Sequence, residues 1–222
     1  MNVLFRTVIS ALFVAMLLST PQAFADSNNE YAVTITNITR GQTFTPILVA
    51  SHRNHAFSLF TAGEPASEAL ATLAEGGDTQ PLMLLLEANK QVIDFTDSGS
   101  LLTPGESVTV TVAAGSGARN ITLAAMLIPT NDSFIALQSV KAPGDGESVT
   151  YWSPAYDAGS EPNDELCSNI PGPVCGGEGV SAGVSGEGYV HISAGIQGIG
   201  DLLPELYDWR NPVAMITIKH KG

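Results

Sequence analysis

Short segments in which apolar and polar residues alternate dominate the sequence after residue 30, and most are rich in β-branched side chains. Successive side chains of a β-strand point to opposite faces, so a period of two is typical of a strand with one buried side. Gly-, Pro- and Asp-rich turns separate these segments. The pattern predicts a mainly β protein, an antiparallel β-sandwich with strands at 31–36, 46–50, 107–112, 121–128, 134–137, 189–192 and 215–218.

Two segments depart from the strand pattern. Residues 65–75 are rich in Ala, Leu and Glu, place Leu70 and Leu73 on one face, and are followed by a Gly-Gly pair, as expected of a helix. Residues 81–89 fit either a helix or a buried strand, because periodicity does not distinguish the two. We therefore expect one or two short helices against the sheets. Both ends of the domain are predicted strands, which indicates that they pair within the sheets.

The first 25 residues have the pattern of a secretory signal peptide. Arg6 supplies a positive charge, an apolar run follows at 8–18, and small residues precede a cleavage point after Ala25. We expect residues 1–25 to be removed and residues 26–222 to form one domain, exported to the periplasm or the outside of the cell. No later stretch approaches about 18 consecutive apolar residues, so we expect no transmembrane segment in the mature chain.

The charge balance excludes one class of partner. The chain has 9 Lys and Arg against 22 Asp and Glu, a formal net charge of −13. So acidic a surface is repelled by the phosphate backbone, so we expect no nucleic-acid binding. The hydrophobic content of 44% also excludes a disordered acidic tail.

Cys167 and Cys175 are the only two cysteines of the chain. They lie close together around a Pro-Gly-Pro turn, and an exported chain meets an oxidising compartment, so we predict one disulfide between them. A metal-binding thiolate pair is the alternative. It lacks both a second cysteine pair and the spacing of a zinc ribbon.

The densest set of oxygen-bearing side chains lies at residues 157–165. Calcium takes six to eight oxygen ligands, and Gly159 would let the backbone bend so that Asp157 and Glu161 share one ion. Asp132 lies in a turn between two predicted strands and would supply a third carboxylate if both loops lie at the same end of the sandwich. The alternative is a solvated acidic face with no bound ion.

No catalytic motif has the context that its chemistry needs. The G-x-S-x-G at 179–183 lies in Gly-rich coil instead of between a strand and a helix. His52 and His55 lack the Glu of a zinc-binding H-E-x-x-H. Paired carboxylates for glycoside hydrolysis are not excluded, because their separation depends on the fold. We expect a protein that is not an enzyme, with a secreted hydrolase using paired carboxylates on the same scaffold as the alternative.

Several segments together resemble the spondin N-terminal domain, in the form found as a stand-alone secreted bacterial protein. The most specific are the D-A-G-S-E loop at Asp157–Glu161 and the W-R-N-P-V-A segment at Trp209–Ala214. Further segments that carry the resemblance are 170–173, 186–191 and 195–202. It extends from about Tyr31 to Ile218.

The resemblance implies a β-sandwich similar to C2 domains that binds calcium at loops at one end. The family's I-P-S-P-D turn matches Ile128–Asp132, and its D-A-G-T-D loop matches Asp157–Glu161. The match implies Asp132, Asp157 and Glu161 as the calcium ligands. We therefore expect a calcium-binding module for binding or adhesion, whose partner is an extracellular protein or surface ligand.

Overall fold

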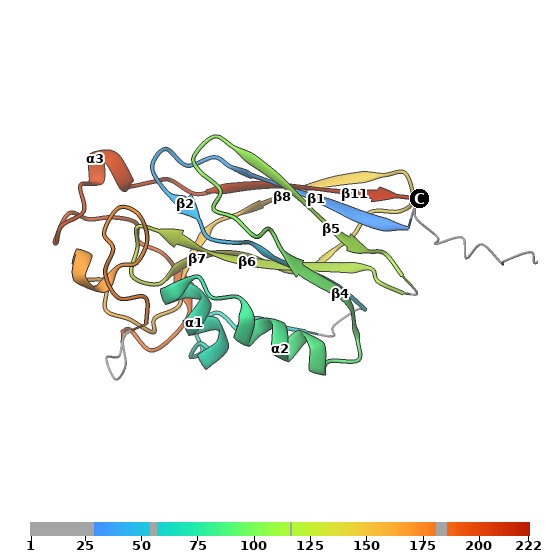
Figure 1. Cartoon of the computed structure of the whole chain (residues 1–222), viewed down its shortest axis with the longest axis horizontal. Helices are drawn as coiled ribbons and strands as arrows, with labels where there is room; N and C mark the ends of the chain where they lie inside the picture. The colour runs from blue at the N-terminus through green and yellow to red at the C-terminus, as the bar shows by residue number, and fades with distance from the viewer. Residues whose placement is uncertain (1–28, 54–56, 116, 181–185) are drawn as a thin grey trace, which may run out of the picture.

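A computed structural model describes residues 29–53, 57–115, 117–180 and 186–222 of the chain. The predicted signal peptide lies outside these residues, as does the Ser of the G-x-S-x-G. Two antiparallel sheets pack face to face and form a β-sandwich, which confirms the predicted fold class (Figure 1).

The four-stranded sheet and the seven-stranded sheet enclose the main core. The four-stranded sheet has the order β5 (Ser107–Ala113), β1 (Glu30–Asn37), β11 (Ala214–Lys221) and β8 (Ser148–Ser153). The seven-stranded sheet has the order β10 (His191–Ile192), β9 (Ala155–Asp157), β7 (Ser133–Lys141), β6 (Asn120–Ile128), β3 (Leu48–His52) and β4 (Val92–Asp97), with β2 (Thr43–Phe44) paired to β6.

In the described part of the chain, helices cover one of the two outer faces. Helices α1 (Glu68–Gly76) and α2 (Gln80–Ala88) lie on the outer face of the seven-stranded sheet (Figure 1). The short helix α3 (Pro204–Tyr207) and the 3₁₀ turn η1 (Cys167–Asn169) lie among the loops at one end. The sequence predicted one or two helices, and of the ambiguous residues 81–89 all but the last proved to be helical. Helix α3 was missed because four residues are too few to show a period.

The strand sequences differ between the two sheets, because helices pack on the outer face of the seven-stranded sheet and the outer face of the four-stranded sheet is exposed to solvent. On the bare face of the four-stranded sheet, cross-strand hydroxyls pair with each other: Thr34 Oγ1 lies 2.8 Å from Thr109 Oγ1, and Thr150 Oγ1 lies 3.1 Å from Thr217 Oγ1. The other faces of these strands are apolar and buried between the sheets. A strand with one solvent-exposed face tends to alternate, which is why β1, β5 and β11 of this sheet were easy to recognise in the sequence.

Strand β6 is instead buried on both faces, which explains its unbroken apolar run. Ile121 and Leu123 belong to the core between the sheets. Ala124 belongs to a second core, where Leu70 and Leu73 of α1 pack on the seven-stranded sheet. Burial of each large side chain in these cores contributes on the order of 1.5–3 kcal/mol to stability.

The two ends of the described chain lie side by side in the middle of the four-stranded sheet. Strands β1 and β11 pair antiparallel, from Glu30 opposite Lys221 to Asn37 opposite Ala214. This confirms the prediction that the terminal strands pair. The predicted disulfide between Cys167 and Cys175 is also present. None of the helices in the described part of the chain has the length and apolar character needed to cross a membrane.

Candidate metal centre

Asp132 is placed by the tight turn that joins β6 to β7. The hydroxyl of Thr130 donates to the carbonyl of Leu127 at 2.6 Å and accepts the backbone N–H of Ser133 at 3.1 Å. The Thr side chain thus bonds the backbone on both sides of the turn, as hydroxyls often do. The turn holds Asp132 fully buried at the end of the sandwich, immediately before β7.

The carboxylate of Asp132 binds the loop that follows β9. Its Oδ2 accepts the backbone N–H groups of Ser160 at 2.8 Å and Glu161 at 3.0 Å. Its backbone carbonyl accepts the N–H of Ala158 at 3.1 Å. The two acidic loops that are distant in the sequence therefore lie together. The other oxygen, Oδ1, is buried and has no hydrogen-bond partner among the described residues.

Asp157 is the last residue of β9 and is also buried. In the sheet it lies opposite Ser133 of β7 on one side and His191 of β10 on the other. Its Oδ1 accepts the backbone N–H of Gly159 at 2.9 Å, and its Oδ2 accepts the side-chain amide of Asn163 at 2.8 Å. The strand ladder and these bonds fix the carboxylate toward the same end of the molecule as Asp132.

A second loop brings two further ligand groups beside Asp157. Glu187 Oε1 accepts from the side-chain amide of Asn163 at 3.1 Å, and His191 Nε2 lies 3.4 Å from Asp157 Oδ1. One ligand atom each of Asp157, Glu187 and His191 lies within 4.8 Å of the other two. Neither Glu187 nor His191 was predicted from the sequence as a metal ligand, although the segment 186–191 carries part of the family resemblance.

Glycines permit this close approach of the loops. A Cβ on Gly159, which has a φ of 62°, would lie 2.3 Å from the carbonyl oxygen of Tyr189. A Cβ on Gly186 would lie 2.4 Å from the carbonyl oxygen of Glu161. Any larger residue at either position would separate the two loops. From the sequence, Gly159 was expected to let the backbone bend. In the structure its missing side chain also lets the loop after β9 approach Tyr189 closely.

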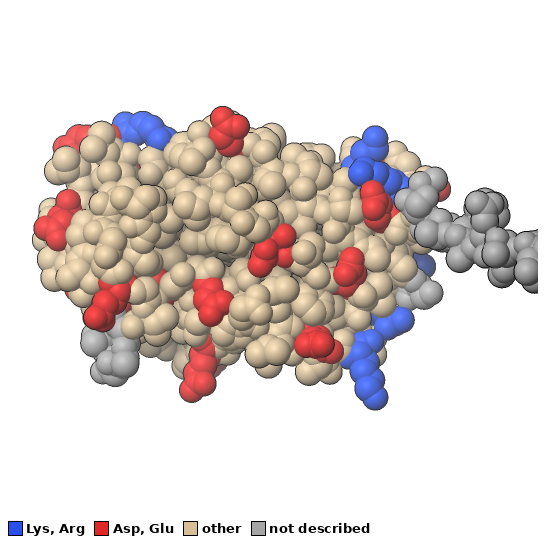
Figure 2. Space-filling view, in the orientation of Figure 1, with Lys and Arg blue, Asp and Glu red and all other residues tan. Residues whose placement is uncertain are grey.

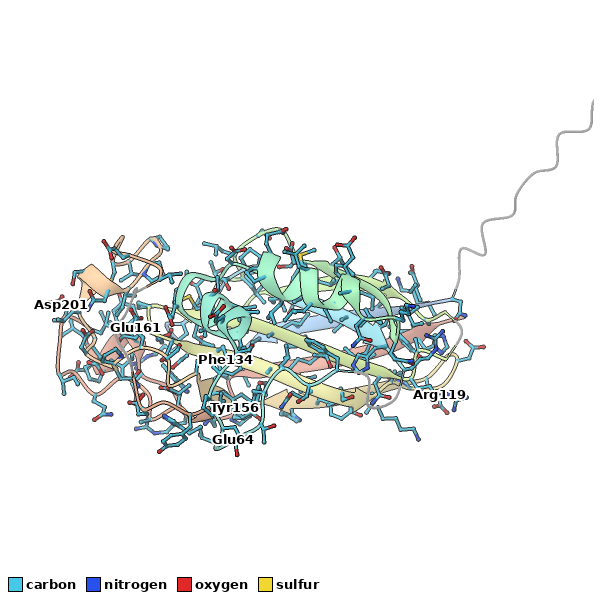
Figure 3. All side chains as sticks on the ribbon, turned by 90° about the horizontal axis from the view of Figure 1, so that it is seen from below. Glu64, Arg119, Phe134, Tyr156, Glu161 and Asp201 are labelled. Carbon is cyan, nitrogen blue, oxygen red and sulfur yellow. A yellow bond between two sulfur atoms is a disulfide. The ribbon has the colours of Figure 1, made fainter. Side chains whose placement is uncertain are left out.

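Glu161 contacts the site through its backbone N–H, which donates to the carboxylate of Asp132. Its side chain is 2% exposed, and the residue lies among the loops at the end opposite Arg119 (Figure 3). The structure thus brings all three predicted ligands to one end, with Asp132 and Glu161 in direct contact. The tight group of ligand atoms is a different set, which shares only Asp157 with the predicted one.

The carboxylates of the site are held in an environment that opposes their charge. Burial, followed by the neighbouring charge of Asp157, raises the pKa of Asp132 to about 8, although the N–H bonds from Glu161 and Ser160 act to lower it. Burial also raises the pKa of Asp157, against the lowering effects of Asn163, Gly159 and His191. Neither carboxylate forms an ion pair with a Lys or Arg in the described part of the chain.

These residues provide the chemistry of a cation site. Buried charges in proteins are normally paired or bound to a metal, and a carboxylate oxygen is a ligand that hard divalent cations prefer. A cation beside Asp132 and Asp157 would offset both the burial and their mutual repulsion. The unpartnered oxygen of Asp132 is an available ligand atom for such an ion.

Comparison with known proteins gives one result that bears on identity. The Spondin_N family model matches residues 27–160, more than half of the chain. The matched range includes Asp132 and Asp157 and ends one residue before Glu161; residues 161–222 lie beyond it, although the sequence resemblance extends further. No curated protein sequence matches the chain. The match over residues 27–160 shows that the chain belongs to the spondin N-terminal domain family.

Proposed function

We propose that this protein is an exported calcium-binding module that serves binding or adhesion outside the cytoplasm. The observation that carries the proposal is the buried Oδ1 of Asp132, which has no hydrogen-bond partner among the described residues, beside Asp157, whose charge raises the pKa of Asp132. A divalent cation removes that opposition. The family supports the role of an extracellular binding module, and the disulfide suits an oxidising compartment.

The proposed ligands are Asp132, Asp157 and Glu161, as the family resemblance implies. Glu187 lies beside Asp157 and adds a further carboxylate to the oxygen ligands of the proposed ion. Calcium accepts six to eight oxygens in an irregular arrangement, so loop carbonyls and water complete the shell. The ion would hold the loops after β6 and β9 to the loop before β10.

Exposed apolar side chains around these loops support a binding role. Tyr189 is 45% exposed and Ile192 53% exposed, and both flank the Glu187 and His191 ligand groups. Ile199 and Leu203, in the neighbouring loop and before α3, are also exposed. Large apolar side chains beside polar groups are typical of surfaces that contact other proteins.

Thermal unfolding with calcium and with a chelator tests the proposal. An ion that binds only the folded protein raises the Tm, by an amount that grows with the calcium concentration. We expect this rise for the wild type and for the control Glu87→Gln, which removes an exposed carboxylate on α2. We expect it to disappear in the double variant Asp132→Asn/Asp157→Asn. An equal Tm with calcium and chelator in the wild type would refute calcium binding.

A transition metal such as zinc is a second candidate, and His191 is the observation that favours it. Imidazole is a preferred ligand of zinc and not of calcium, and His191 completes a group with Asp157 and Glu187. Replacing His191 with Asn separates the two ions. Calcium stabilisation should persist in His191→Asn, whereas a zinc site would lose most of its affinity.

The alternative of a secreted hydrolase rests on the two close carboxylates Asp132 and Asp157. A carboxyl whose pKa is raised to about 8 is protonated at neutral pH and is a general acid by its chemistry. The spondin N-terminal domain family is not a known enzyme family. Hydrolysis of a glycoside or ester substrate that is lost in Asp132→Asn would favour this alternative over a binding module.

A further inference from the structure

A cavity of about 670 Å³ lies at the end of the sandwich opposite the candidate metal centre. Its walls come from both sheets: Tyr31 and His220 lie on the central strands β1 and β11, and Arg119 and Lys141 lie at the ends of β6 and β7. Figure 3 shows Arg119 far from Glu161. The volume is within the range of about 300–1,000 Å³ that holds small-molecule ligands in proteins.

The walls of this cavity are apolar in part and are fixed by hydrogen bonds. The rings of Tyr31 and His220 pack with their centroids 4.7 Å apart. The Tyr31 hydroxyl donates to the carbonyl of Ala118 at 2.9 Å, and the Tyr151 hydroxyl donates to the carbonyl of Lys141 at 2.7 Å. These bonds tie the four-stranded sheet to the seven-stranded sheet across the cavity. The cavity is therefore preorganised, which lowers the entropic cost of binding a ligand.

Two cationic side chains line the cavity without partners. The backbone N–H of Ala142 donates to the carbonyl of Arg119 at 2.8 Å, so Arg119 and Lys141 belong to adjacent chain segments. In the described part of the chain, neither of these two side chains forms a hydrogen bond or an ion pair. The acidic residue of the lining, Glu147, accepts the backbone N–H of Gly144 at 3.1 Å instead. An anion between Arg119 and Lys141 would offset their repulsion.

The distribution of charge over the molecule favours an anion at this end. The chain is strongly acidic, yet the Lys and Arg visible in Figure 2 gather toward one end. Arg53 lies beside Gly117 of the cavity lining and donates to the carbonyl of Lys90, and Lys219 and Lys221 flank His220 in the sequence. Lys221 pairs with Glu30 at 3.1 Å, so it is the other cations at this end that attract anions to the cavity mouth.

We propose that this cavity binds a small organic anion. The oxyanion group, a carboxylate or a phosphate, is held by Arg119 and Lys141, since a guanidinium offers paired donors to such groups. The apolar part of the ligand packs on the rings of Tyr151 and His220, which are the partly exposed aromatic rings of the lining. The site is independent of the metal centre and of calcium.

The test is a titration of the purified protein followed by the backbone amide signals in NMR spectra. The probes are benzoate and phenyl phosphate, with benzyl alcohol as the neutral analogue and inorganic phosphate as the anion without a ring. We expect saturable shifts of the amides of residues 117–119, Lys141, Ala142 and Gly144 with one or both phenyl anions. Which anion binds more tightly identifies the oxyanion group. We expect both benzyl alcohol and inorganic phosphate to bind at least about tenfold more weakly.

A pair of charge variants completes the experiment. Arg119→Gln/Lys141→Gln should lower the affinity for the phenyl anions by about tenfold or more. Lys90→Gln/Lys219→Gln removes the same charge from the same end without touching the cavity lining and should retain the affinity within about twofold. Equal losses in both variants, or no loss in the first, would overturn the proposal. So would phosphate binding as tightly as phenyl phosphate, or no saturable shift up to about 10 mM of either phenyl anion.

Discussion

The carboxylate of Asp132 accepts the backbone N–H of Glu161 at 3.0 Å, across 29 positions of sequence. One oxygen of Asp132 thus holds the loop after β9, while the other has no hydrogen-bond partner among the described residues. A single side chain both shapes the candidate metal centre and adds charge to it. These two roles respond differently to substitution, and the first prediction separates them.

Asp132→Asn keeps a side-chain oxygen that can accept the N–H of Glu161 but removes the ionisable group. In chelator at neutral pH we expect this variant to be more stable than the wild type by on the order of 1 kcal/mol, because burial raises the pKa of Asp132 to about 8 and folding of the wild type therefore requires the uptake of a proton. Calcium should add little to its stability. Asp132→Ala removes the acceptor as well and should be destabilised with and without calcium. Urea unfolding under both conditions measures this; an Asn variant weaker than the wild type in chelator would contradict it.

Glu187→Gln tests the carboxylate that the sequence did not suggest. Glu187 is exposed, so the substitution should leave the metal-free stability within about 0.5 kcal/mol of the wild type. We expect calcium affinity, measured by calorimetry, to fall by roughly tenfold, since a charged ligand is replaced by a neutral one. Glu178→Gln, at another exposed position, is the matched control. Equal affinities in the two variants would exclude Glu187 from the site.

The buried carboxylate of Glu165 binds the backbone of the loop at residues 197–199. It accepts backbone N–H groups from Gln197 at 2.5 Å, Gly198 at 2.8 Å and Ile199 at 2.9 Å. Glu165→Ala leaves these donors without their acceptor and should cost about 2 kcal/mol or more. Hydrogen exchange at residues 197–199 should accelerate more than at β6. Unchanged exchange in that loop would show that other contacts hold it.

The disulfide closes a short loop, because Cys167 and Cys175 have a sequence separation of 8. The chain-entropy relation gives a contribution of about 2.5 kcal/mol for a loop of this size. We expect Cys167→Ser/Cys175→Ser to lower the free energy of unfolding by that amount in urea while the far-ultraviolet dichroism stays the same. Adding a reductant should reproduce the loss in the wild type and have no effect on the variant. A response of the variant to reductant would contradict this account.

His52 makes the stability depend on pH. The ring is fully buried, with Nε2 2.8 Å from Thr122 Oγ1 and Nδ1 2.8 Å from the carbonyl of Arg53, and burial lowers its pKa. The neutral ring is therefore favoured in the folded state. Its contribution is fully present above about pH 6.5 and is lost as the pH falls through the lowered value. His52→Gln should show a smaller loss of stability than the wild type between pH 7 and pH 5, in urea unfolding. Parallel curves would contradict the prediction.

Much of the fold could be predicted because one face of the four-stranded sheet is exposed to solvent. Strands such as β1 and β5 alternate over much of their length, since Thr34 and Thr109 face water while their neighbours face the core. Strand β8 was missed although its residues also alternate in exposure. Strand β9 has only three residues and exists through its pairing with β7 and β10. Such a strand has no period of its own to recognise.

The candidate site was only partly predictable for a similar reason. Asp132, Asp157 and Glu161 follow from the oxygen-rich loop and from the family resemblance. Glu187 and His191 reach Asp157 through the pairing of β10 with β9 and through the contact of Gly159 with Tyr189. These are tertiary contacts between distant segments. Chain spacing carries no information about them.

The pairing of β1 with β11 decides from which end of the sandwich this protein can be attached to a surface. Asn29 and Gly222 lie at the same end of the sandwich, where Asn29 Oδ1 is 2.8 Å from His220 Nε2, so a tether attached beyond either residue leaves the sandwich from that end. The loops around Asp157 then face outward, toward a neighbouring surface. Immobilisation through that end should accordingly leave the loops around Asp157 accessible, whereas the cavity beside Tyr31 would lie close to the support.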